Sequence, residues 1–138
     1  MKLPLLLQIA GLLHLVLLCA GATMPHAVKM RENLVSLPPF LRRLFLVYYG
    51  FIAMLIAGFG CITFFNASEL AAGGPLAKAL CGFLILFWGA RLAVAAFVFD
   101  VRPYLTSLLL RVGYQVTNLV FIYLLAVYVL VFWKGGTP

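Results

Sequence analysis

A few polar side chains set within long apolar segments are the residues of this chain that could do chemistry. Arg91 lies inside one such segment, and a polar stripe runs along the next. The stripe comprises Tyr104, Ser107, Arg111, Gln115 and Asn118. Its three- and four-residue spacing places these side chains on one face of a helix. Because a guanidinium can hold phosphate through two parallel hydrogen bonds, Arg91 and Arg111 could flank an anionic headgroup that the amides orient.

Arg91 is the most unusual of these residues. It lies eight residues before Phe99, about 12 Å along a helix, and its side chain should lean away from that end. Arginine keeps its charge in proteins, and Asp100 lies about 13 Å along a regular helix. We expect Arg91 to find a polar side chain, a carbonyl, Asp100 through a bend, an anionic lipid or ligand, or another chain's carboxylate. Trp88, one turn back, could add a cation–π contact.

Two interpretations of this set stay open. The first is structural: the polar groups form interhelical hydrogen bonds of about 0.6 kcal/mol each, and Arg111 extends its guanidinium to the nearby interface. In the second, a lipid headgroup, an anion or a partner subunit contacts the set. Its members are then Trp88, Arg91, Arg111, Tyr114, Gln115 and Asn118.

Cofactor and metal chemistry has little support in the sequence. His14 lies near the middle of the first apolar segment, and His26 is about 18 Å further along a helix, so a second haem ligand would have to be Met54 or come from another chain. We expect His14 to be a hydrogen-bonded packing residue. The three cysteines form no Cys-x-x-Cys pair, and no carboxylate lies inside the apolar segments. We therefore expect no catalytic residue, no metal site and no cofactor.

The composition indicates the elements that position these groups. Of 138 residues, 66% are hydrophobic and 9% are charged. An ordinary soluble domain has about 25% charged residues. Four apolar segments reach the roughly 20 residues that span a bilayer, at about 3–23, 40–65, 76–99 and 105–133, with prolines or glycines between them. These features predict a single all-α domain over residues 1–138, an integral membrane bundle of four transmembrane helices.

Two segments near the N-terminus need separate interpretation. Lys2, the following apolar run and Cys19–Ala22 have the form of a signal peptide, but we expect the segment to be retained as a membrane helix. In the first loop, residues 27–37 predict a short amphipathic helix that lies in the membrane interface. Its apolar face would comprise Ala27, Met30, Leu34 and Leu37.

The basic residues predict the orientation of the bundle. The net charge is +7, and the basic residues other than Arg91 occur near helix ends, without a nucleic-acid motif. Six flank the first and third loops, namely Lys29, Arg31, Arg42, Arg43, Arg102 and Arg111, and three lie on the other side, namely Lys2, Lys78 and Lys134. By the positive-inside rule we expect both termini outside, with the plasma (inner) membrane as the location.

Small residues suggest where helices could meet. In a membrane, close packing of helices depends on glycine, alanine and similar residues. One stripe comprises Gly50, Ala53, Ala57 and Cys61, and a second comprises Gly82, Gly89, Ala93 and Ala96. Either stripe could meet a neighbour in this bundle or a second protein.

We expect a small non-catalytic subunit of a membrane complex, with respiratory and electron-transfer complexes among the candidates. The short loops, the lack of a soluble domain and an Arg91 with no acidic residue in the membrane segments favour it. The alternative is a lipid-, quinone- or anion-binding protein that works alone or as a homo-oligomer, and a weaker one is a subunit that holds a cofactor with other chains. The expected partners are membrane lipids and other membrane subunits or a second copy, not nucleic acid.

Overall fold

A computed structural model describes residues 2–27, 29–98, 100 and 102–136. The described residues contain four helices long and apolar enough to span a membrane. They are α1 (Leu3–Ala27), α3 (Pro39–Phe65), α5 (Pro75–Phe97) and α6 (Leu108–Lys134). The prediction of an all-α four-helix membrane bundle is confirmed. Helix is the required form because lipid offers no hydrogen bonds to the backbone.

The boundaries of the last two long helices differ from the prediction. Helix α5 ends at Phe97, and Phe99, the expected end, lies outside the described residues. Helix α6 begins at Leu108 and not at Leu105, because a 3-10 turn, η1 (Arg102–Tyr104), contains Pro103. Ser107 then caps α6 by accepting a hydrogen bond from the Leu110 amide at 3.2 Å. Ser107 of the polar stripe is therefore used as a helix cap.

Two short helices occupy the first and second loops. Helix α2 (Met30–Val35) is shorter than the expected 27–37, because Lys29 has a left-handed backbone with φ 50° and Ala27 belongs to α1. Helix α4 (Ala67–Ala72) lies in the second loop and has Asn66 at its N-cap position. It ends at Gly73, whose φ of 74° suits glycine, and the Gly136 amide donates to the Ala71 carbonyl at 3.3 Å. This bond joins α4 to the end of α6.

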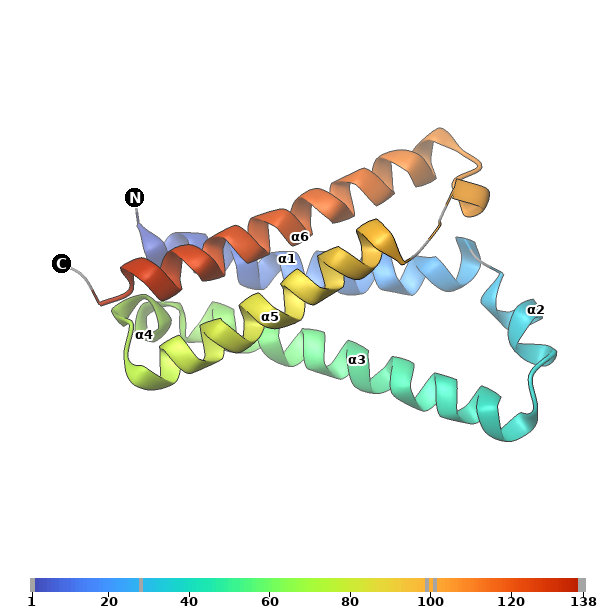
Figure 1. The fold of residues 1–138 in the computed structure, drawn as a ribbon, viewed down its shortest axis with the longest axis horizontal. Helices are drawn as coiled ribbons and strands as arrows, with labels where there is room; N and C mark the ends of the chain where they lie inside the picture. The colour runs from blue at the N-terminus through green and yellow to red at the C-terminus, as the bar shows by residue number, and fades with distance from the viewer. Residues whose placement is uncertain (1, 28, 99, 101, 137–138) are drawn as a thin grey trace.

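The four long helices pack closely at one end and diverge at the other (Figure 1). Helix α1 contacts α3, α6 and α4, and α5 contacts α6. The two termini and α4 lie at the compact end, whereas α2 and η1 lie where α3 and α6 spread apart. The core lies toward the compact end. Its largest fully buried side chains include Trp88, Tyr128, Leu7, Leu84, Leu124 and His14.

Two glycines allow α1 and α3 to cross at close range. A Cβ added to Gly11 would lie 2.7 Å from the Phe64 Cβ and 2.9 Å from the Gly60 carbonyl oxygen. A Cβ added to Gly60 would lie 2.7 Å from the His14 Cβ. These separations are shorter than side chains permit, so the crossing requires glycine at both positions. Neither glycine belongs to the two stripes that the sequence suggested.

The second suggested stripe meets α6 in part. Added Cβ atoms at Gly82 and Gly89 would touch Phe132 at 3.6 Å and Leu125 at 3.8 Å, both on α6. The first stripe is different, since a Cβ at Gly50 would meet nothing within 4 Å and Cys61 is exposed. Between Pro39 and Gly58, no described residue of α3 is buried. This N-terminal part of α3 therefore contributes no fully buried residue to the bundle.

Candidate functional site

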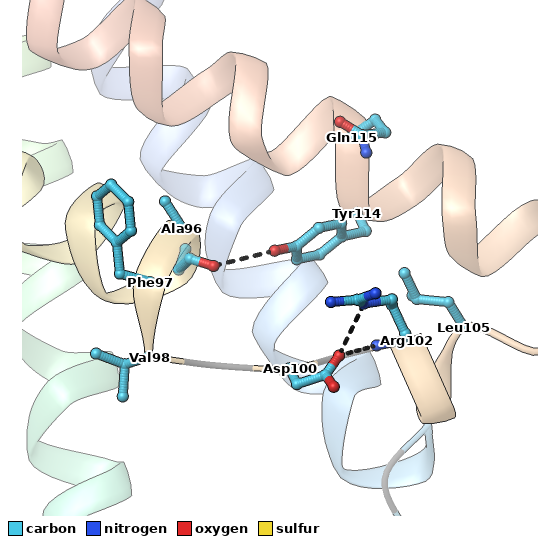
Figure 2. Close-up of a pocket in the computed structure, with 9 residues that line it drawn as sticks. Ala96, Phe97, Val98, Asp100, Arg102, Leu105, Tyr114 and Gln115 are labelled. Carbon is cyan, nitrogen blue, oxygen red and sulfur yellow. Dashed lines mark hydrogen bonds and ion pairs between the residues drawn. The ribbon is translucent and has the colours of Figure 1, made fainter.

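An open wedge lies between the end of α5 and the first half of α6. Its volume is about 440 Å³, and Figure 2 shows it in close-up. It is lined by Ala95, Ala96, Phe97, Val98, Asp100, Arg102, Leu105, Tyr114 and Gln115. Tyr114 and Gln115 are two of the six residues predicted to contact a ligand or partner. The wedge thus brings part of the predicted set to a surface that opens at the diverging end of the bundle.

Tyr114 and an ion pair give the wedge its polar groups. The Tyr114 hydroxyl reaches across from α6 and donates to the Ala95 carbonyl of α5 at 3.5 Å, a weak hydrogen bond (Figure 2). On the connecting loop, Asp100 Oδ1 lies 3.3 Å from Arg102 Nε and accepts from the Arg102 amide at 3.1 Å. The mouth of the wedge therefore carries one negative and one positive side chain that face solvent or headgroups.

Arg91 and Trp88, which the sequence suggested as its cation–π partner, both contact the ring of Phe121 on α6. The Arg91 guanidinium carbon lies 5.6 Å from the centroid of the Phe121 ring on α6. Trp88 stacks on that same ring at 5.5 Å and is fully buried. Arg91 thus faces α6 from α5 and makes a cation–π contact with Phe121. Trp88 belongs to the core and does not line the wedge.

The polar stripe divides into two halves. Near the start of α6, Arg111 Nε donates to the Leu105 carbonyl at 3.2 Å, so this side chain runs toward the helix N-terminus as snorkelling requires. The side chain of Tyr104 lies outside the described part of the chain. Further along, Gln115 is exposed and Asn118 half-buried. Arg111 and Asn118 do not line the wedge, so the structure does not bring all six predicted residues together.

Gln115 and Asn118 are the distinctive polar groups of this region. Within the described residues, neither amide has a hydrogen-bond or ion-pair partner. They lie about 10 Å and 15 Å along α6 from Leu108. Neighbouring Thr117 shows the contrast, since its hydroxyl donates to the Gly113 carbonyl at 2.8 Å. Lipid tails cannot satisfy an amide, so Gln115 and Asn118 call for a polar partner.

No family model, curated protein or solved structure matches this chain. The site must therefore be interpreted from its own geometry.

A buried polar cluster, which the sequence did not reveal, lies in the core. His14, Thr63, Trp88 and Tyr128 come from α1, α3, α5 and α6, one from each long helix. The Thr63 and Tyr128 hydroxyls share a hydrogen bond of 2.7 Å. The His14 ring centroid lies 5.3 Å from that of Trp88 and 6.3 Å from that of Tyr128. In the sequence, His14 and Trp88 stand out for separate reasons, and no spacing links the four residues.

His14 does not fit the role of a haem ligand in this bundle. Its Nδ1 is 2.8 Å from the Ala10 carbonyl, which fixes the ring along its own helix. Its Nε2 has no partner in the described part of the chain, but the side chain is fully buried against aromatic rings, and a porphyrin would have to displace them. Met54, the ligand considered for the second axial position, is exposed on α3. Nor do the described residues bring three or more His, Cys, Asp or Glu side chains together.

The hydrogen bond between Thr63 and Tyr128 should contribute modestly to stability. We expect a double-mutant cycle with Thr63→Val and Tyr128→Phe to give a coupling free energy of about 0.6 kcal/mol, and no more than about 1.7 kcal/mol. The cycle is measured from unfolding transitions in a mild detergent. Zero coupling would mean that the two hydroxyls do not bond in the folded protein.

Proposed function

We propose that this chain is a non-catalytic structural subunit of a multi-subunit membrane complex. The observation that carries the proposal is the pair of amides on α6, Gln115 and Asn118, which have no partner among the described residues. An interhelical hydrogen bond from another subunit would satisfy them, because polar side chains join helices within membranes. Respiratory and other electron-transfer complexes are the first assemblies in which we would look for the chain.

The N-terminal part of α3 supports the same proposal. Residues Pro39 to Gly58 include no buried side chain, although four of the exposed ones are aromatic. Gly50 on this segment has open space around it. Small residues on a membrane helix favour close approach of a neighbour, and the neighbour here would be another chain. This surface alone would equally suit lipid. The proposal therefore rests on the two amides, and the surface of α3 is supporting evidence.

The test is to replace both amides and measure retention of partners. We expect native mass spectrometry of the chain, extracted from its own membrane in a mild detergent, to detect it in a complex with other polypeptides at fixed stoichiometry. The double variant Gln115→Leu/Asn118→Leu should bind them about tenfold more weakly, since two interhelical hydrogen bonds of about 0.6 kcal/mol each are lost.

Thr117→Val is the matched control for this test. It removes a polar group from the same stretch of α6, but one that bonds within its own helix. Partner retention should therefore stay at the level of the native chain. The proposal is wrong if the native chain is extracted from its membrane without other polypeptides. It is also wrong if the double variant retains its partners as well as the control does.

A second candidate function has one observation in its favour, the wedge of about 440 Å³ with its Asp100–Arg102 pair. A zwitterionic or anionic lipid headgroup could bind there, with Gln115 as a hydrogen-bond donor. The Tyr114 hydroxyl could donate as well if it left the Ala95 carbonyl. The two functions separate experimentally because Gln115 lines the wedge and Asn118 does not. Headgroup binding predicts that Gln115→Leu loses the lipid and Asn118→Leu keeps it, whereas both variants should weaken a subunit contact.

A further inference from the structure

A second cleft lies at the diverging end of the bundle, away from the wedge. It occupies about 420 Å³ between the end of α1, the short helix α2 and the first half of α3. Most of its lining is apolar, with Pro25, Met30, Leu34 and Leu46 among the contributors. Three other side chains that line it carry polar groups, namely Arg31, Arg42 and Tyr49. Figure 1 shows α2 bridging the space between α1 and α3 at this end.

Hydrogen bonds from two side chains, Arg42 and Tyr49, join the elements that form the walls of the cleft. The Arg42 guanidinium of α3 donates to three carbonyls near the end of α2, those of Leu34 at 3.0 Å, Val35 at 3.1 Å and Leu37 at 3.3 Å. The Tyr49 hydroxyl of α3 donates to the Gly21 carbonyl of α1. Arg42 and Tyr49 thus tie α3 to both neighbouring elements. These bonds keep α2 and the end of α1 beside α3 around the cleft.

Arg31 is the cation that these structural bonds leave available. It is exposed and lines the cleft, and within the described residues it makes no hydrogen bond or ion pair. Three further cations, Lys29, Arg42 and Arg43, lie between residues 29 and 43, against Glu32 as the one acidic residue there. The local charge is thus positive, beside a cavity whose walls are apolar. That combination matches an anion joined to a hydrocarbon chain.

We infer that this cleft binds one anionic phospholipid, with its phosphate on Arg31 and part of an acyl chain between α2 and α3. Free phosphate would satisfy Arg31 but leave the apolar walls uncovered, and a neutral lipid would fill the walls but leave Arg31 without an anion. A guanidinium also matches the planar geometry of two phosphate oxygens. The inference uses no residue of the wedge or of the α6 amides, so it is independent of the proposed subunit role.

The experiment places the purified chain in bilayers of phosphatidylglycerol and phosphatidylcholine and counts retained lipids by native mass spectrometry. We expect one phosphatidylglycerol to remain on the native chain after mild detergent treatment. Arg31→Gln should reduce that retention about tenfold, the effect of losing a charge-assisted hydrogen bond. Leu46→Trp, which fills the cleft, should reduce it as well.

Arg43→Gln is the matched control, because it removes the same charge from an exposed position outside the cleft lining. Its retention of phosphatidylglycerol should stay within twofold of the native level. Thermal unfolding of each variant confirms that the bundle is intact. Equal losses for the Arg31 and Arg43 variants would mean that only general surface charge attracts lipid, and the inference would be wrong. It would also be wrong if inorganic phosphate displaced the lipid and Leu46→Trp had no effect, since the site would then hold only an anion.

Discussion

Replacing Gly60 with alanine should destabilise the folded bundle by about 1–3 kcal/mol, the usual cost of forcing an extra methyl group into a packed interior. The added Cβ would lie 2.7 Å from the His14 Cβ and 3.1 Å from the Gly11 carbonyl oxygen. Neither neighbour is the end of a flexible side chain, so α1 must move away from α3. Unfolding of the purified chain in a mild detergent, followed by circular dichroism, measures the loss.

Gly58→Ala is the control for this prediction, because it makes the same chemical change two residues earlier on α3. A Cβ at Gly58 would meet nothing within 4 Å. Alanine is also the better helix former, so this variant should be as stable as the native chain or slightly more so. If the Gly58 and Gly60 variants lose equal stability, the helices do not cross at Gly60. Gly11→Ala should behave like Gly60→Ala, since it meets the Phe64 Cβ at 2.7 Å.

The four long helices could be predicted because their signals are local. Long apolar segments, with Pro39 and Pro75 at the first position of a helix, predict where α3 and α5 begin. The remaining boundary errors came from features that hydropathy does not register. Examples are the left-handed backbone at Lys29 and the 3-10 turn at Arg102–Tyr104. Each moved a predicted helix end by about three residues.

The contacts between helices could not be predicted in the same way. In a lipid solvent every face of a helix can be apolar, so apolar periodicity does not tell which face turns inward. The stripe around Gly50 was the more regular signal on α3, yet Gly60 is the residue at the crossing. No small residue lies three or four positions from its partner Gly11, so Gly11 belongs to no stripe of small residues. The rotation of each helix about its axis decides such pairs, and only the three-dimensional arrangement reveals it.

The candidate site was predictable to the extent that it lies on one helix. The polar stripe of α6 was visible because Arg111, Gln115 and Asn118 share a helical face. The buried cluster was not, since His14, Thr63, Trp88 and Tyr128 come singly from four helices. Trp88 shows the limit most clearly. Its position one turn before Arg91 gave no sign that it stacks on Phe121 in the core.

Trp88→Ala should be the most damaging single substitution in this chain, with an expected loss of about 3–5 kcal/mol. The side chain is 1% exposed. Its ring contacts Phe121, stacked at 5.5 Å, His14 at 5.3 Å and Phe87 at 5.0 Å. Removing the indole would leave a cavity where α1, α5 and α6 meet. The indole nitrogen has no partner in the described part of the chain, so the loss should come from packing and not from a hydrogen bond.

Two comparisons separate packing from other effects. Trp133→Ala makes the same replacement at a side chain that is 76% exposed near the end of α6, and it should change stability by no more than about 0.5 kcal/mol. Trp88→Phe keeps most of the packed volume, so it should lose clearly less stability than Trp88→Ala. In a Trp133→Phe background, Trp88 is the one remaining tryptophan, and its fluorescence should be blue-shifted and shift to the red on unfolding. Emission typical of a hydrated indole in the folded protein would contradict the buried position of Trp88. Helices α1, α5 and α6 would then have to pack together through other residues.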